Sequence, residues 1–229
     1  MAMKGKTKIR LATIVLAPLL LAVAYVVFVV RSATEKTELV HRSVARYERF
    51  GLTLESVPAE WISHLLAVED PGFYEHHGVD LTTPGAGLTT ISQGLVKIHY
   101  FDDFEPGFAK LKQTILAIIL DSELTKQQQL VLLLNTARLG TVHGETISGF
   151  PDAAEAYFGK GFSELSHREF ISLVAMLVAP NRYHVAASPE ENAERVNHIL
   201  AMLAGRCKPE GFRDVYYKNC AAEAALSSQ

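Results

Sequence analysis

Several features that are common in other protein classes are scarce or absent in this sequence. Cysteine occurs only twice, and the two residues have no obvious ligand partners that would make a zinc site. No internal repeat is visible, and alternation of polar and apolar residues never extends beyond a few positions. The composition excludes collagen-like, low-complexity and mostly disordered chains. At 229 residues the chain suffices for one globular unit with accessory segments.

Acidic residues are missing from the first 30 positions, which contain Lys4, Lys6, Lys8 and Arg10. The chain has 22 basic and 25 acidic residues, so residues 31–229 carry 18 basic residues against all 25 acidic ones, a net charge of −7. Non-specific binding to nucleic acid needs a basic face that neutralises phosphates. The acidic body therefore argues against a nucleic-acid partner.

Residues 11–30 contain no charged side chain, and a helix of this length spans the ~30 Å of a bilayer core. Because basic residues precede it, the sequence predicts a cytoplasmic tail over 1–10, a transmembrane anchor over 11–30 and an exported body. A cleaved signal peptide is one alternative, with Ala22-Val23-Ala24 resembling a cleavage site inside the apolar run. A buried core helix is the other alternative.

The two cysteines, Cys207 and Cys220, fit an exported body, because an oxidising compartment would let them pair. A disulfide that closes so short a loop would contribute about 3 kcal/mol in the chain-entropy model. The alternative is two unrelated free thiols.

The body is predicted to be mostly α-helical, with one core. Residues 31–56 are polar and are predicted to form a short juxtamembrane helix or connector. Glycine and proline predict loops over 71–88 and 140–149. Apolar periodicity and capping residues predict helices from residue 57 to about 68 and over 89–100, 108–120, 126–134, 152–158, 166–178, 189–204 and 212–225. Thr125 is a good N-cap for the helix from residue 126, and Ser166 with Glu169 three residues later is a capping-box pattern.

Three segments contain residues that could carry chemistry. Glu69 and Asp70 end an apolar helix, where a half-buried carboxylate can act as a base near neutral pH. Thr89 to Lys97 places hydroxyls, an amide and an ammonium at a helix start, which would suit a phosphate. Lys110 and Gln113 share a helix face. Taken singly, each segment is better explained by solvated or capping side chains than by a functional site.

Together these segments resemble the glycosyltransferase family 51 domain, the peptidoglycan transglycosylase module of class A penicillin-binding proteins and monofunctional transglycosylases. The first motif of that family is matched at every position, and the second is matched closely. The matching residues of the first motif are Glu69, Asp70, Phe73, His76 and Gly78, and those of the second are Gly87, Thr90, Ile91, Gln93, Leu95 and Lys97, with Thr89 and Ser92 as hydroxyl exchanges.

The likeness continues through weaker third and fourth motifs and a specific last motif, from about residue 57 to residue 183. The third and fourth are matched at Lys110, Ala117, Asp121, Lys126, Leu130, Asn135 and Gly140. The last is matched at 149–151, 153–154, 157–160, 165–166, Glu169 and 179–183. The resemblance therefore implies a transglycosylase-like domain over 57–185, followed by a C-terminal helical extension over 186–229.

The resemblance implies a lysozyme-like, two-lobed helical fold and lipid II, a polyprenyl-pyrophosphate-linked disaccharide-pentapeptide, as substrate. Glu69 aligns with the general base, Gln113 with the second catalytic acid, and Lys97 and Lys110 with residues that face the pyrophosphate. The further substrate-binding residues it implies are Asp70, Phe73, His76, Thr89, Thr90, Gln93 and Asn135. A divalent cation, Mg²⁺ or Mn²⁺, is a candidate cofactor. The implied location is the bacterial inner membrane, with the body periplasmic or extracytoplasmic.

The sequence departs from the family pattern where the chemistry is concentrated. Gln113 replaces the second acid and cannot accept a proton, while Ala109 replaces an arginine and removes a bidentate phosphate contact. Only eight residues separate Gly78 from Gly87, where the family has a longer segment. Other departures are Gly94, Ile98, Val131 and Leu133.

Three functional hypotheses therefore stay open. One is an active, divergent peptidoglycan glycosyltransferase. The second is a non-catalytic relative that binds lipid II, nascent glycan or another protein of cell-wall synthesis. The third is a lysozyme-like glycan hydrolase, which also tends to need a second carboxylate. Asp102, Asp103, Glu105 and Asp121 are candidates to replace the missing acid.

Overall fold

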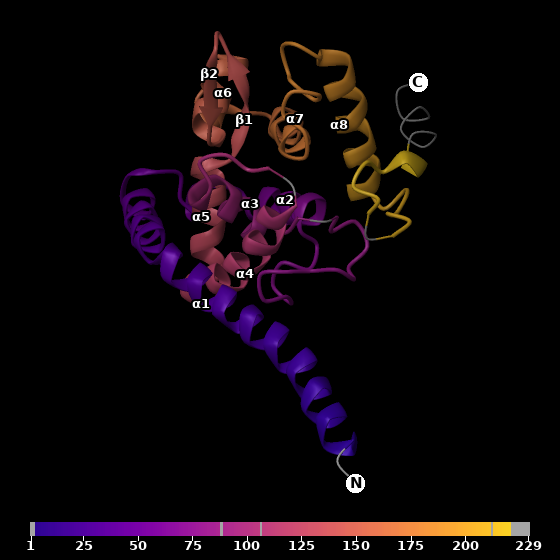
Figure 1. Cartoon of the computed structure of the whole chain (residues 1–229). Helices are drawn as coiled ribbons and strands as arrows, with labels where there is room; N and C mark the ends of the chain where they lie inside the picture. Colours follow the sequence, from indigo (N-terminus) through magenta and orange to yellow (C-terminus); the bar gives the residue numbers. More distant parts are fainter. Residues whose placement is uncertain (1–2, 88, 106, 212, 221–229) are drawn as a thin grey trace.

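The computed structural model describes residues 3–87, 89–105, 107–211 and 213–220, with side chains from residue 16 onward except that of residue 218. The mostly helical fold is confirmed (Figure 1). Its elements are α1 (Met3–Phe50), α2 (Ala59–Glu69), α3 (Ile91–Tyr100), α4 (Phe108–Glu123), α5 (Lys126–Thr136), β1 (Arg138–Val142), β2 (Glu145–Ser148), α6 (Phe150–Phe158), α7 (His167–Leu177) and α8 (Pro189–Leu203), with 3₁₀ turns at Leu54–Ser56, Phe162–Glu164 and Lys218–Cys220.

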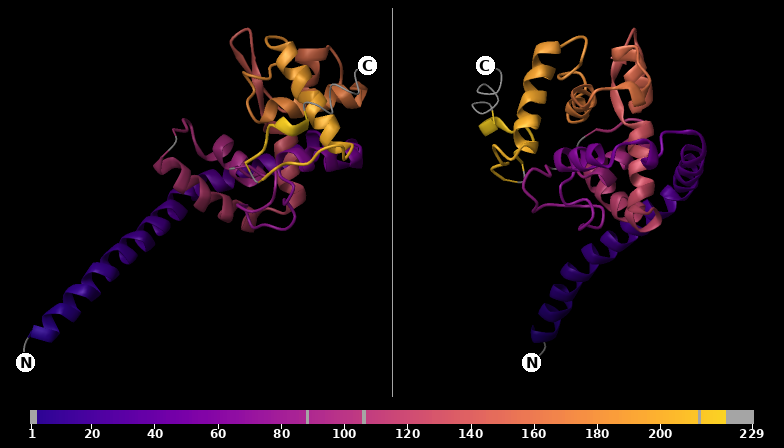
Figure 2. Two further views of the ribbon diagram at one scale, coloured as in Figure 1. Left: turned by 90° about the vertical axis from the view of Figure 1, so that its right-hand side faces the viewer. Right: turned by 180° about the vertical axis from the view of Figure 1, so that it is seen from behind.

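The N-terminal helix α1 is long and projects away from the body (Figure 2). Its described part from Leu16 onward is long and apolar enough to cross a membrane. Pro18 lies inside the helix and does not end it.

The short helix or connector predicted over 31–56 is mainly a continuation of α1, which is unbroken to Phe50. Val29, Ala33, Val40 and Val44 are buried in the core of the body, and their spacing of four and seven residues places them on one helix face. Lys36 fixes the same helix to the body, because its Nζ donates to the carbonyl of Tyr100 at 3.2 Å.

The body has two parts in Figure 1. Helices α3, α4 and α5 pack together and against α1, and β1, β2, α6, α7 and α8 form the part farther from the N-terminus. Leu65 of α2, Leu134 of α5 and Phe170 of α7 are fully buried in the same continuous core. The predicted helices of these segments are present, with ends shifted by up to a few residues.

Capping residues explain where three of the helices begin. The side chains of Thr90, Thr125 and Ser166 accept hydrogen bonds from the backbone N–H three residues ahead, and each completes a capping box. The Thr125 cap and the Ser166–Glu169 pair predicted from the sequence are therefore confirmed.

The loop predicted over 140–149 is wrong, because β1 and β2 pair there as an antiparallel hairpin. His143 and Gly144 occupy the turn, and both have positive φ, 51° and 86°. Two residues with positive φ give a turn whose twist matches that of the two strands. His-Gly is not one of the usual sequence signals for such a turn.

Residues 205–211 and 213–220, called the strap here, return from the end of α8 toward the loop that follows α2. Cys207 and Cys220 form a disulfide that closes the strap on itself. The predicted helix over 212–225 is wrong for its described part, which contains only the 3₁₀ turn at 218–220. Residues 212 and 221–229 lie outside the described part of the chain.

Candidate active site

A cavity of about 440 Å³ lies where the two parts of the body meet. Its size is in the range of small-molecule sites in proteins. Its polar and charged lining comes from Glu69 of α2, Thr89 and Thr90 before α3, Lys97 of α3, Lys110 and Gln113 of α4, Arg138 of β1 and Arg195 of α8. Residues far apart in the sequence are thus brought together around one cavity.

Glu69 is the last residue of α2 and lies partly buried at the cavity wall. Burial raises the pKa of Glu69 to about 7, while the positive charge of Arg195 lowers it and the negative charge of Asp70 raises it. A carboxyl with this pKa is partly ionised near neutral pH. It can therefore accept a proton there, as a general base must.

Gln113 lines the same cavity as Glu69 and is 1% exposed. Its amide Nε2 donates to the carbonyl oxygen of Gln93 at 2.7 Å, so it ties α4 to α3. Its Oε1 is buried and has no hydrogen-bond partner among the described residues. The amide therefore acts as a donor at the position where the family resemblance implies a carboxylate.

Positive charge dominates the described lining of the cavity. Lys97, Lys110, Arg138 and Arg195 face it, whereas Glu69 is the only acid among the described lining residues. Lys110 donates to the hydroxyl of Thr89 at 3.3 Å. Burial and the charge of Lys97 lower the pKa of Lys110. This concentration of charge suits an anion, although the body as a whole is acidic.

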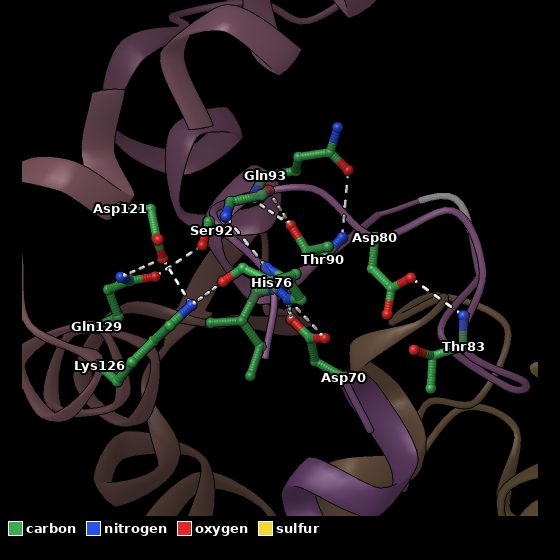
Figure 3. A network of polar contacts seen from close by, with 12 residues as sticks. Asp70, His76, Asp80, Thr83, Thr90, Ser92, Gln93, Asp121, Lys126 and Gln129 are labelled. Atoms are coloured by element: carbon green, nitrogen blue, oxygen red, sulfur yellow. Dashed lines mark hydrogen bonds and ion pairs between the residues drawn. The ribbon is translucent and has the colours of Figure 1, made fainter. Parts of the chain in front are cut away.

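Asp70 follows Glu69 directly in the sequence, and its side chain belongs with that of His76 to a buried network of polar contacts (Figure 3). The carboxylate of Asp70 accepts from the N–H of Ile91 at 2.9 Å and contacts Nε2 of His76 at 2.9 and 3.0 Å. Burial raises the pKa of Asp70, opposed mainly by the Ile91 hydrogen bond. The hydroxyl of Thr90 donates to the carbonyl of Gly78 at 2.7 Å. This network fixes the start of α3 against the loop after α2.

Lys126 extends the same network to α4 and α5 (Figure 3). Its ammonium donates to the carbonyl of His76 at 3.0 Å and to the carboxylate of Asp121 at 2.6 Å. Gln129 donates to Asp121 at 2.9 Å and accepts from Ser92 at 2.7 Å. Asp121 therefore has a structural partner on each side and does not line the cavity.

Of the residues implied by the family resemblance, six line the cavity and five do not. Glu69, Thr89, Thr90, Lys97, Lys110 and Gln113 line it. The other five do not line it, and their side chains are buried or hydrogen-bonded elsewhere: Asp70, Phe73, His76, Gln93 and Asn135. The Asn135 amide, for example, both donates to and accepts from the backbone of Leu52.

None of the candidate replacement acids lines the cavity. Asp102 is exposed and pairs with Lys36, while Asp121 is held by Lys126 and Gln129. Asp103 lies beside Asp102, in a separate hollow next to α1.

Two arginines and a valine of the cavity wall were missed by reasoning from the sequence. Arg195 and Val215 lie within the predicted extension, and Arg138 lies where a loop was expected to begin. Arg195 is 3% exposed, and its guanidinium donates to the carbonyls of Ala175 and Val215 at 3.1 and 2.8 Å. An arginine in a predicted helix with mostly polar neighbours gives no sequence signal for such burial.

The cavity does not fit a divalent cation such as Mg²⁺ or Mn²⁺. These ions take oxygen ligands, typically carboxylates, and the described lining offers one carboxylate among four cationic side chains. Among the described residues, no group of three or more histidine, cysteine, aspartate or glutamate side chains could hold a metal ion.

Comparison with known proteins agrees with this geometry. The family model described as Transglycosylase matches residues 36–204, well over half of the chain. This chain belongs to the transglycosylase family. The match begins inside α1 and ends at the C-terminus of α8, so the strap lies beyond it.

Curated relatives of this transglycosylase-family chain are penicillin-binding proteins. Penicillin-binding protein 1B of Buchnera aphidicola is 32% identical over 169 residues, which are 68% of this chain and 22% of the relative. Penicillin-binding protein 1F of Bacillus subtilis is 31% identical over 165 residues, which are 66% of this chain and 22% of that protein. Penicillin-binding protein 1A of Escherichia coli is 30% identical over 176 residues, which are 70% of this chain and 20% of that protein. The chain thus matches about a fifth of each relative's length.

The family membership supports a glycosyltransferase-like role in peptidoglycan synthesis. The single N-terminal apolar helix and these relatives fit a single-pass protein of the inner membrane.

Proposed function

We propose that this protein is a membrane-anchored peptidoglycan glycosyltransferase-like protein whose cavity binds lipid II. The observation that carries the proposal is that Glu69, a carboxyl with a pKa of about 7, lines the same cavity as Lys97 and Lys110. A base and an anion site in one cavity are the two elements that transfer of a sugar from a pyrophosphate requires.

In this proposal Glu69 accepts the proton of the 4-OH group of the acceptor sugar. The hydroxyl oxygen attacks the anomeric carbon of the donor while the bond from that carbon to the pyrophosphate oxygen breaks. Polyprenyl pyrophosphate leaves with the electron pair, and the cations of Lys97 and Lys110 stabilise the charge that develops on it. The apolar helix keeps the cavity close to the lipid tail of the substrate, with the N-terminus cytoplasmic and the body outside.

Gln113 favours a second candidate function, a protein that binds lipid II or nascent glycan without polymerising it. Its amide donates to Gln93, and no second acid lines the described cavity wall. Removal of one catalytic group commonly lowers a rate about 10²–10⁴-fold. A cavity that retains its cations but lacks that acid can still hold the ligand.

The test uses the full chain in detergent with labelled lipid II, measuring both binding and polymer on a gel. Glu69→Gln is compared with Glu155→Gln, the same exchange on the exposed face of α6. Polymer from the parent that is lost only in Glu69→Gln supports the enzyme. Binding without polymer supports the second candidate, and absence of binding by a folded parent overturns both.

A further inference from the structure

The strap forms part of the cavity wall, although it lies outside the part of the chain that matches the transglycosylase family. Val215 of the strap lines the cavity together with Glu69 and Arg195. Its carbonyl accepts the hydrogen bond from Arg195 at 2.8 Å. Arg195 thereby joins α8, the strap and the cavity at one point.

A second contact reaches the helix that carries Glu69. Tyr217 is fully buried, and its hydroxyl donates to the carbonyl oxygen of Val68 at 3.1 Å. Val68 immediately precedes Glu69 at the end of α2, where backbone carbonyls lack partners within the helix. Tyr217 thus fixes the turn from which the Glu69 side chain extends.

A third set of contacts holds the loop between α2 and α3. The N–H of Gly85 donates to the carbonyl of Gly211 at 3.0 Å. A side chain at Gly87 would meet Val215 at 2.7 Å, and one at Gly85 would meet Pro209 at 3.0 Å. The backbone of this loop therefore packs against side chains of the strap, and there is no space for a larger residue at Gly87.

The disulfide closes the strap around these contacts. Cys220 follows Tyr217 by three residues and is fully buried, and Cys207 lies just after α8. Asn219 adds a hydrogen bond to the carbonyl of Lys208 at 2.6 Å. The bond thus joins both ends of the segment that presents Val215 and Tyr217.

We propose that the strap is a functional part of the lipid II site. In this proposal Tyr217 positions Glu69, and Val215 closes one wall of the cavity. The Cys207–Cys220 disulfide keeps Tyr217 and Val215 in these places. The proposal rests on the proposed function for the identity of the ligand. Its geometric part, the strap holding α2 and the loop, does not depend on that ligand.

The test compares the parent with Tyr217→Phe and with the double variant Cys207→Ala/Cys220→Ala. Tyr216→Phe is the matched control, since it removes the neighbouring hydroxyl from a ring that lies outside the cavity wall. Hydrogen exchange of the peptides covering 66–70 and 85–87 is measured first, without ligand. We expect faster exchange at 66–70 in Tyr217→Phe, and at both sites in the double variant.

Lipid II binding by the full chain is measured next, across pH and well below each variant's melting temperature. Because Tyr217→Phe loses one hydrogen bond, we expect its dissociation constant for lipid II to be about two- to tenfold higher than that of the parent. The pH midpoint of binding should also move toward the ordinary carboxyl range, because Glu69, which faces Arg195, Asp70 and Tyr217, becomes more hydrated. A merely structural strap would lower the melting temperature and leave this midpoint unchanged.

The outcomes separate the two proposals. Unchanged exchange at 66–70 and 85–87 in both test variants overturns the strap inference, whatever the ligand. Changed exchange with unchanged lipid II affinity and midpoint limits the strap to a structural role and also overturns it. If the parent itself does not bind lipid II, the proposed function fails, and the exchange data still decide whether the strap holds Glu69.

Discussion

The Nε2 atom of His76 lies 2.9 Å from Oδ1 of Asp70, while Nδ1 of His76 accepts the N–H of Gly78 at 3.1 Å. Nδ1 is therefore the acceptor and Nε2 the donor, which is the arrangement of a neutral imidazole with one defined tautomer. The Asp70–His76 pair belongs to the scaffold that places Glu69 and does not itself reach the cavity.

His76→Ala should therefore lower the free energy of unfolding by about 1–3 kcal/mol, because the buried carboxylate of Asp70 loses a partner. Urea denaturation of the full chain in detergent measures this. His77→Ala is the control, since its side chain is 95% exposed. Equal destabilisation by the two exchanges would contradict a structural role for His76.

Glu69→Gln should change the dependence of stability on pH. The pKa of Glu69 rises from 4.5 to about 7 on folding, so the unfolded chain loses this proton at lower pH than the folded chain. The folded state is consequently destabilised as pH rises from about 4.5 to about 7, by about 3 kcal/mol at most. Glu69→Gln lacks this destabilisation, because glutamine does not ionise. Its stability relative to the parent should therefore increase from pH 4 to pH 8, as measured by thermal unfolding. A constant difference over that range would refute the raised pKa.

Gln113→Glu should destabilise the fold, although it restores the acid of the family pattern. The introduced carboxylate would face the carbonyl of Gln93, which now accepts a hydrogen bond at 2.7 Å. Two hydrogen-bond acceptors that face each other in a buried contact lower the free energy of unfolding by about 1–3 kcal/mol. The loss should grow with pH as the introduced group ionises.

Gln127→Glu is the matched control for this exchange, because Gln127 is exposed on α5. Chemical denaturation at pH 5 and pH 8 measures both variants. A gain of polymer from a stable Gln113→Glu protein would show instead that the cavity accommodates the carboxylate.

Lys97→Ala and Lys110→Ala should each weaken binding of inorganic pyrophosphate about tenfold or more, because hydrogen bonds to charged groups contribute about 1.5–3 kcal/mol. Calorimetric titration at two salt concentrations is the measurement, and binding should weaken at the higher one. Lys112→Ala is the control, since Lys112 lies over the ring of Phe101 and does not line the cavity. Loss of affinity in the control alone would place the anion elsewhere.

Local patterns predicted much of the helical body correctly. Capping residues such as Thr125 and Ser166 predict where helices begin, because the hydrogen bond of a cap joins residues within one helical turn. The continuation of α1 through residues 31–50 was also present as a pattern, in the spacing of Val29, Ala33, Val40 and Val44. It was hidden by the polar residues between them, which face away from the body or pair on its surface.

The cavity could be predicted only in part. Glu69 and Lys97 lie in segments whose residue types indicate chemistry, and both line it. Arg195 and Val215 are brought there by contacts between residues far apart in the sequence, which no local pattern encodes. The hydrogen bond from Gln113 to Gln93 is equally invisible in the sequence, since it depends on how α4 packs against α3.

In the proposed membrane-anchored protein, the unbroken course of α1 would also set how the body is oriented relative to the membrane. Its 48 residues correspond to about 72 Å of helix at a rise of about 1.5 Å per residue, and one face of the later turns packs against the core. A continuous helix, and not a flexible linker, therefore joins the body to the apolar segment. The tilt of the body consequently follows the tilt of α1. Each residue added between the two would also swing the cavity opening by about 100° around the helix axis. The same helix therefore sets both the orientation of the body and its distance from the apolar segment.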